Sequence, residues 1–203
     1  MLIDPAEDGI RTMKGEIEMQ VTDVHELLRR CIEYHGHYCI GQSLGVRIAR
    51  KGLELIAPES EKDLIVYLEN DRCIADAILI ATGTRLGRRS LKLVDYGKMA
   101  ATFVNLKKDI AYRVGLNQFD LGDASKEEAK ARVLSMADDE LLSWKKVRVR
   151  IRKEELPGKP ERVVRCVRCG EKVFDAKDIA EYGAEAGPFC IPCAHGAYYE
   201  PEE

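Results

Sequence analysis

Apolar residues recur every three or four positions in some stretches of this chain and at every second position in others. The first spacing puts one apolar face on a helix, and the second puts one on a strand. Helical spacing predicts helices over residues 23–34, 41–56, 72–81 and 125–136, with a further helical turn or two over 138–144. Alternation predicts strands over 64–69, 91–97 and 145–152, and a hairpin over 99–116 that turns at 107–109. We therefore expect an α+β fold with mixed helices and a mainly antiparallel sheet.

One predicted helix carries a stripe of small residues. Gly41, Gly45, Ala49 and Gly52 follow one another at spacings of four, four and three, so they share a face. Each glycine inside a helix costs about 0.5–1 kcal/mol relative to alanine. We expect a second helix or a backbone segment to pack very closely against this stripe and offset that cost.

Composition excludes some classes of protein. The chain of 203 residues has no apolar run near the ~20 residues that a membrane span requires, and it opens on no signal-peptide pattern. We therefore expect a cytoplasmic protein without a membrane partner. The net charge of −3 gives no general attraction for nucleic acid. Seven cysteines is an odd number, which excludes a complete disulfide framework and favours metal ligands or reactive thiols.

Four cysteines crowd the last forty residues in the pattern C-x2-C, twenty residues, C-x2-C. Each pair can form a tight turn that points two thiolates at one ion, and two pairs complete a tetrahedral shell. The spacing predicts a zinc ribbon over residues 163–203, and two disulfides, a redox pair or an iron centre with the same ligands are the alternatives. The charged segment 153–162 holds two prolines and a glycine, which predicts a linker after a first domain over 1–152. The predicted zinc ligands are Cys166, Cys169, Cys190 and Cys193.

A second group of soft ligands lies at the end of the first predicted helix. His35, His37 and Cys39 stand at alternate positions, so a looped segment could point all three the same way. Cys73 stands at the start of another predicted helix, where the helix dipole favours a thiolate. Together these four residues predict a second metal site suited to zinc. The alternative is that the histidines only cap a helix and the cysteines fill a core.

Three ordered motifs resemble the FmdE family, which is named for a component of molybdenum formylmethanofuran dehydrogenase. They are "YHGHYCIGQSLG", "CIADAILIATGTRLGRRSL" and "DYGKMAATF", and the resemblance covers roughly residues 20–150. It implies an α+β core that is often dimeric, a metal-lined cleft and a frequent C-terminal zinc ribbon. It also implies an accessory component of a larger oxidoreductase complex in one-carbon or redox metabolism, and it leaves open whether this chain is itself an enzyme.

The resemblance also nominates site residues. It places His37, Cys39, Asp76 and Lys98 in the catalytic set, with Cys73 as a further ligand. Asp76 follows Cys73 by three residues and so shares its helix face, where it could orient a histidine or act as a general base. Lys98 could hold an anionic substrate. An ordinary salt bridge is the alternative reading for Asp76 and Lys98.

The chain departs from the family pattern in the second motif. Thr84 stands where the family has a cysteine, and threonine is a poor ligand for a soft metal. Arg85 and Arg88 follow, and they predict a positive loop that could bind the phosphate or carboxylate of a cofactor or substrate. A solvated basic turn is the alternative.

Three functions are compatible with these patterns. The first is a metal-binding FmdE-like protein that uses the His/Cys group on a small molecule. The second is a nucleic-acid-associated or transcription-associated regulator that acts through its ribbon, whose basic edge comprises Arg162, Arg165, Arg168 and Lys172. The third is a zinc-dependent hydrolase or lyase.

Overall fold

The structure is a computed structural model that describes residues 23–182 and 185–202. Residues 1–22, which the predicted first domain includes, lie outside the described part. The helices are α1 (Val24–His35), α2 (Ile40–Ile56), α3 (Cys73–Thr82), α4 (Lys126–Ser135), α5 (Asp138–Leu141) and α6 (Ile191–His195). The strands are β1 (Leu64–Leu68), β2 (Leu91–Leu93), β3 (Ala100–Asn105), β4 (Ile110–Leu116), β5 (Leu142–Val147), β6 (Val163–Arg165), β7 (Lys172–Phe174), β8 (Ile179–Tyr182) and β9 (Glu185–Phe189). Two 3-10 turns, η1 (Glu61–Asp63) and η2 (Lys153–Glu155), complete the elements.

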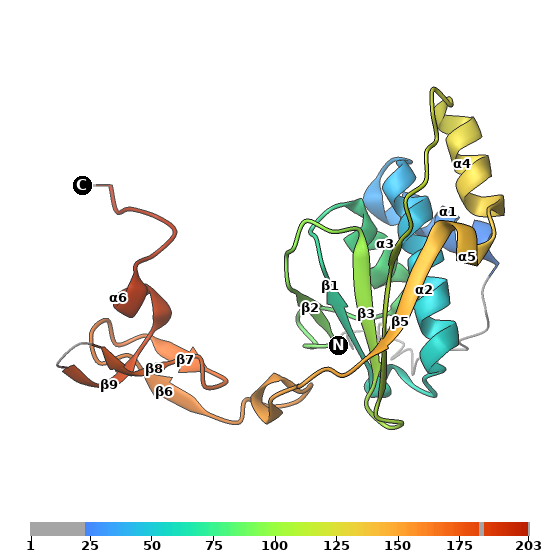
Figure 1. Ribbon diagram of the computed structural model, residues 1–203. Helices are drawn as coiled ribbons and strands as arrows, with labels where there is room; N and C mark the ends of the chain where they lie inside the picture. Colours follow the sequence, from blue (N-terminus) through green and yellow to red (C-terminus); the bar gives the residue numbers. More distant parts are fainter. Residues whose placement is uncertain (1–22, 183–184, 203) are drawn as a thin grey trace, which may run out of the picture.

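Five strands form the main sheet in the order β2-β1-β3-β4-β5 (Figure 1). Only β1 and β2 are parallel, because the chain crosses from one to the other through α3. The other neighbours are antiparallel, with the hairpin β3–β4 turning at the predicted lysines. The predicted α+β fold with a mainly antiparallel sheet is confirmed.

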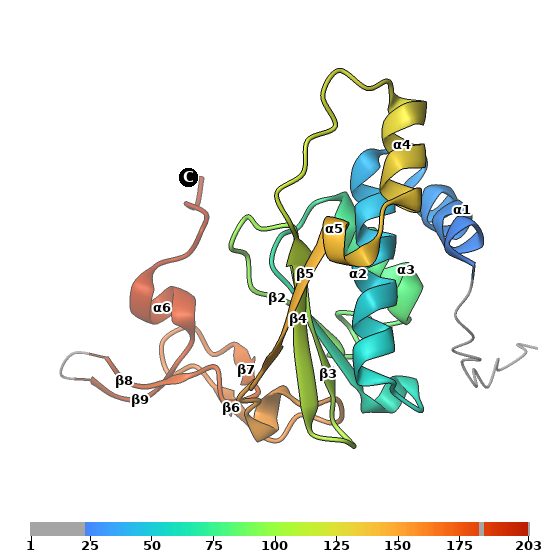
Figure 2. The same cartoon turned by 45° about the vertical axis from the view of Figure 1, so that its right-hand side comes forward.

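Helices α2 and α3 cover one face of this sheet, and α1 packs against their outer side (Figure 2). The core between the layers is built from side chains of α2, α3 and alternate positions of the strands, such as Ile48, Ile78, Val66 and Phe103. On the opposite face, a smaller apolar cluster around Ile65, Val104 and Ala111 is covered in part by residues that follow β5. No helix in the described ranges is long and apolar enough to cross a bilayer.

The small-residue stripe of α2 packs as the sequence predicts. A Cβ added at Gly45 would lie 2.6 Å from the Cβ of Ala77 on α3, and one added at Gly52 would overlap the ring of Phe103 on β3. Glycine therefore lets α2 approach both α3 and the sheet closely, and this packing offsets the cost of glycine in a helix.

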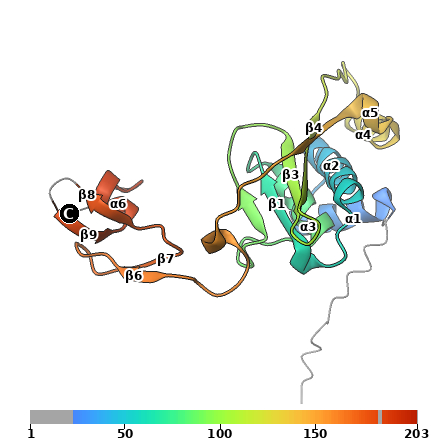
Figure 3. The ribbon, with the colours of Figure 1, turned by 60° about the horizontal axis from the view of Figure 1, so that its bottom comes forward.

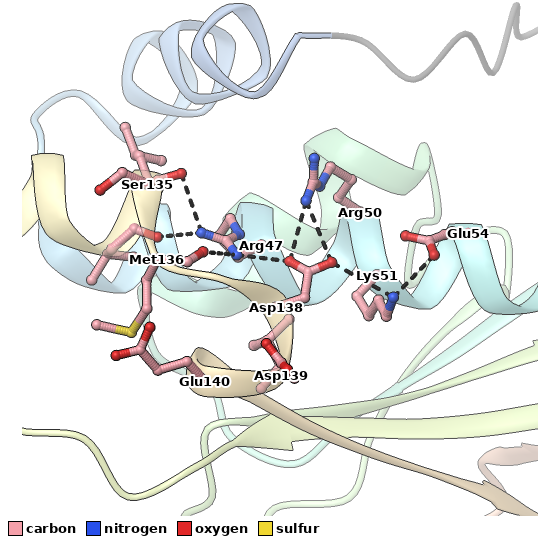
Figure 4. A network of polar contacts seen from close by, with 12 residues as sticks. Arg47, Arg50, Lys51, Glu54, Ser135, Met136, Asp138, Asp139 and Glu140 are labelled. Atoms are coloured by element: carbon pink, nitrogen blue, oxygen red, sulfur yellow. Dashed lines mark hydrogen bonds and ion pairs between the residues drawn. The ribbon is translucent and has the colours of Figure 1, made fainter.

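Between β4 and β5 the chain leaves the sheet and forms α4 and α5, which return against α2. Arg47 of α2 anchors the α4–α5 segment. Its guanidinium donates to the carbonyls of Leu134 and Met136 and to the carboxylate of Asp138 (Figure 4). Arg50 and Lys51 face the same carboxylate at 3.2 and 3.6 Å. Three cations of α2 thus converge on the first residue of α5.

Two predictions for this region were wrong in detail. Helical structure over 138–144 ends at Leu141, and the strand expected over 145–152 runs over Leu142–Val147 instead. Leu142 pairs with Leu116 and Val147 pairs with Ala111. Because β4 begins at Ile110, the alternating residues after Val147 have almost no neighbouring strand to pair with, and the ladder ends there.

The C-terminal segment forms two small sheets, β6–β7 and β8–β9, followed by α6. Figure 3 shows this part to one side of the main sheet, connected to it by the chain that follows β5. The shape and the four cysteines are consistent with a small ribbon domain of the kind that binds zinc.

Candidate metal centres

The four C-terminal cysteines converge. Their Sγ atoms all lie within 4.8 Å of one another. Two thiolates that share a zinc ion at about 2.3 Å in tetrahedral geometry lie about 3.8 Å apart. The Sγ atoms of Cys169 and Cys190, one from each pair, are 3.8 Å apart. This group therefore fits a tetrahedral metal ion.

The turn around the first pair is shaped for thiolates. Gly170 adopts a positive φ of 77°, and its N–H donates to the carbonyl of Cys166 at 2.9 Å. The backbone N–H groups of Cys169, Cys190 and Arg168 point at the Cys166 sulfur and lower the pKa of that thiol to about 6. These donors favour the deprotonated form that a metal binds.

Three arginines of the ribbon form contacts within it. Arg162 donates to Asp178 at 2.8 Å and Arg165 donates to the carbonyl of Gly170 at 3.0 Å. Arg168 donates to the carbonyl of Cys193, which joins the two cysteine pairs. The basic edge seen in the sequence is in large part engaged in holding the ribbon together.

The second group lies where three helix ends meet. Helix α1 ends at His35 because Gly36 takes a positive φ of 88° and turns the chain away. Cys39 is the N-cap of α2, and Cys73 is the first residue of α3. One donor atom each of His35, Cys39 and Cys73 lie within 4.8 Å of one another, and all three residues are half-buried. Both thiols stand at helix N-termini, where the dipole stabilises negative charge.

Asp76 orients the imidazole of this group. The Nδ1 atom of His35 lies 2.7 Å from Oδ2 of Asp76, one turn along α3 from Cys73. With Nδ1–H donating to the carboxylate, Nε2 of His35 carries the lone pair that a metal ion accepts. A carboxylate in this position is common behind histidines that bind metal ions.

Gly41 makes room for the two thiols. A Cβ at this position would lie 3.2 Å from the Cβ of Cys73 and 3.7 Å from the Sγ of Cys39. The hydrogen bond and charge of the neighbouring Cys39 thiol, together with burial, raise the pKa of Cys73. A cation between the sulfurs would reverse this effect, because it stabilises both thiolates.

Two amide side chains that hold the group were missed from the sequence. Gln42 is fully buried; its Oε1 accepts from the N–H of Cys39 at 3.2 Å and its Nε2 donates to the carbonyl of Cys31 at 3.1 Å. Asn70 donates to the carbonyl of Lys98 at 2.7 Å and accepts from the N–H of Arg72, so it ties the "DYGK" loop to the start of α3. The spacing of Gln42 three residues after the N-cap was the signal that could have found it.

The remaining nominated residues lie outside this group of three. His37 is exposed, with its ring centre 4.8 Å from that of His35. Lys98 and Arg85 are exposed, and Arg88 pairs with Glu61 at 2.8 Å. Thr84 is buried, and its hydroxyl oxygen lies 2.7 Å from the hydroxyl oxygen of Thr82. It follows the C-terminus of α3, about 15 Å along the helix from Cys73, so its replacement of cysteine leaves the group of three unchanged.

Comparisons with known proteins agree with this arrangement. The sequence model of the family described as "FmdE, Molybdenum formylmethanofuran dehydrogenase operon" matches residues 34–162. A crystal structure of an FmdE-like protein of tungsten formylmethanofuran dehydrogenase type from Syntrophus aciditrophicus has the same fold, with a TM-score of 0.60 and 18% identity over 87% of this chain and 95% of that one.

A "Probable S-adenosyl-L-methionine-binding protein" of Archaeoglobus fulgidus is 36% identical over 97 residues. Those residues are 45% of this chain, which spans only 26% of the length of that relative. The family match extends over more than half of the chain and includes all three donors of the first-domain group and Asp76. On this match, the chain belongs to the FmdE family.

Proposed function

We propose that this chain carries two metal ions with different roles. The four cysteines of the ribbon would hold a structural zinc ion, because they can fill all four positions of a tetrahedral shell. His35, Cys39 and Cys73 would hold a second ion at the first-domain site. Three protein donors leave one position for an exchangeable ligand, which is the pattern of a site that acts on a small molecule. The convergence of these three donors carries the proposal.

The residues around the first-domain site would have distinct tasks. Cys39 and Cys73 supply negative charge, His35 supplies a neutral donor, and Asp76 fixes the orientation of that imidazole. A metal ion bound there would polarise an oxygen or sulfur atom of a small molecule as a Lewis acid. The exposed His37 and Lys98 would meet a polar or anionic part of that molecule. The arginine loop is a weaker candidate, since Arg88 is already paired.

The partners follow from the family. Its name refers to an operon of a molybdenum enzyme, so we propose an accessory component of an oxidoreductase complex in one-carbon or redox metabolism, acting as a homodimer. The redox cofactor would belong to another protein of that complex, and this chain would supply a metal site and a docking module.

A regulator that binds nucleic acid through the ribbon is less well supported. Three arginines that would contact phosphate form hydrogen bonds within the ribbon instead. Binding of the full chain to duplex DNA should therefore be absent even at roughly 20–50 mM salt, where basic proteins bind without sequence preference. Tight, salt-dependent binding would favour the regulator.

A zinc-dependent hydrolase or lyase remains a second candidate, because the three-donor group leaves a coordination position open. S-adenosylmethionine is the first small molecule to test, given the name of the Archaeoglobus fulgidus relative. Calorimetric titration of metal-loaded and metal-stripped protein would show whether binding depends on the first-domain ion.

Elemental analysis tests the central proposal. The purified chain should contain two metal equivalents, and Cys39→Ser or Cys73→Ser should remove one while the ribbon stays loaded. Cys31→Ala is the matched control, since Cys31 belongs to neither group of metal ligands. Its thiol is buried and donates a hydrogen bond to the carbonyl of Ala77. This variant should retain two equivalents. Equal metal content in Cys39→Ser and Cys31→Ala would refute a first-domain site.

A further inference from the structure

We propose that Arg89 and Asp175 form a latch that couples metal loading of the ribbon to the order of the linker and of loop 83–90. The loop 83–90 joins α3 to β2 in the first domain, and Asp175 directly follows β7 in the ribbon. This inference rests on the proposed metal in the four-cysteine centre. It adds that this metal orders segments outside the ribbon, namely the linker and the loop 83–90.

Three contacts fasten the segments to one another. The Arg89 guanidinium forms an ion pair with Asp175 and also donates to the carbonyl of Glu154 in η2. The ammonium of Lys92 donates to the next carbonyl, that of Glu155, at 2.6 Å. The side chains of the ion pair are only 21% and 16% exposed. The first residues of the predicted linker are thus bound to Arg89 and Lys92 of the first domain. The ribbon is bound to the same Arg89 through Asp175.

The backbone at both ends of the ion pair is in an unfavourable conformation. Arg89, Asp175 and Ala176 have φ values of 61°, 59° and 52°. They are three of the five non-glycine residues with positive φ in the described part of the chain. Such conformations cost free energy and persist only where surrounding contacts hold them. We infer that the latch and the folded ribbon together hold these residues.

The β6–β7 hairpin links the latch to the cysteines. Each strand has three residues; Cys166 follows β6 at one end, while at the other end the N–H of Asp175 donates to the carbonyl of Arg162 at 2.8 Å. A hairpin this short is unstable alone, and in small metal domains the bound ion supplies the missing stability. Without metal, the hairpin that positions Asp175 for the ion pair with Arg89 would lose this support. Because such coupling is reciprocal, loss of the latch should also weaken metal binding by the ribbon.

Substitution of each latch residue by asparagine tests the inference. Asparagine tolerates positive φ, so Arg89→Asn and Asp175→Asn remove charge with little added backbone strain. Arg88→Asn is the matched control, because Arg88 is the neighbouring arginine and pairs on the surface with Glu61 at 2.8 Å. The readouts are hydrogen exchange at the N–H groups of Glu155 and Leu156, which donate within the linker turn, and zinc affinity of the ribbon by chelator competition.

We expect exchange at Glu155 and Leu156 to rise and ribbon zinc affinity to fall, each roughly 5- to 30-fold, in both latch variants. Metal removal from the wild type should raise exchange at the same two amides. Protection in the β3–β4 hairpin should stay unchanged, which verifies that the first domain is folded.

Two results would overturn the latch: exchange in Arg89→Asn equal to that in Arg88→Asn, or linker protection that survives metal removal. A ribbon that binds no zinc would refute the proposed function itself, whereas a loaded ribbon with an unprotected linker would refute only the latch.

Discussion

The Nδ1 atom of His35 lies 2.7 Å from the Oδ2 atom of Asp76, although the two residues belong to different helices. With Nδ1 hydrogen-bonded to this carboxylate, Nε2 is the ring nitrogen left to bind a metal ion. Asp76→Asn should therefore weaken metal binding at the first-domain site by roughly 10- to 100-fold, as loss of an orienting carboxylate does elsewhere. Chelator competition on the full chain would measure it. Asp71→Asn, a nearby exposed carboxylate, should change nothing; equal effects in both variants would contradict the orienting role.

Substitution of Gly41 should weaken metal binding at the first-domain site more than substitution of the other α2 glycines. In Gly41→Ala the new methyl group would press on Cys73 and approach Cys39, so metal affinity should fall while much of the fold stability is kept. Gly45→Ala is the contrasting variant, because its methyl group meets Ala77 and the backbone of Ile74. It should lose about 1–3 kcal/mol of unfolding free energy from overpacking, less the ~0.5–1 kcal/mol that alanine gains in a helix. Thermal denaturation and metal titration of both variants would separate the effects.

Arg47 should be the most sensitive cation of α2. Its side chain is almost fully buried and donates to backbone carbonyls at the end of α4 as well as to Asp138. Arg47→Met should lower the unfolding free energy by about 3–5 kcal/mol, because buried acceptors lose their donor. Arg50→Met should lower it by less than about 1 kcal/mol, since Arg50 is more exposed. Urea denaturation measures both, and equal losses would contradict the assigned anchoring role.

Asp138 should make stability depend on acid pH. Burial opposes its ionisation, but the hydrogen bond from Arg47 and the charges of Arg50, Arg47 and Lys51 outweigh burial and hold the pKa of Asp138 below its usual value. A lowered folded pKa means that the stabilisation is complete above the unfolded pKa and is lost as the pH falls through the folded value. The stability difference between wild type and Asp138→Asn should be constant above about pH 5 and shrink below about pH 4. A difference that grows on acidification would contradict this assignment.

Local apolar periods predicted helices α1 to α4 and strands β1, β3 and β4 to within one or two residues, whereas the short elements of the ribbon have no such period. The four-residue spacing of Gly41 and Gly45 predicted close helix packing before any partner was visible. The limits of β5 could not be predicted, because they depend on where its neighbour β4 begins, and no local pattern carries that information.

The first-domain site could be predicted in composition but not in geometry. The alternate spacing of His35, His37 and Cys39 predicts both histidines as ligands. Only the structure shows that His35, at the end of α1, meets Asp76 from α3, while His37 lies beyond Gly36. The roles of these residues stay predictions until metal content is measured.

The strand β5 lies at one edge of the main sheet, with Lys145 and Lys146 exposed along it. A second copy joined edge to edge there would bring the same ammonium groups opposite one another, which natural sheets use to prevent such growth. Self-association of this protein would then have to proceed through surfaces other than the β5 edge, where the main sheet would end.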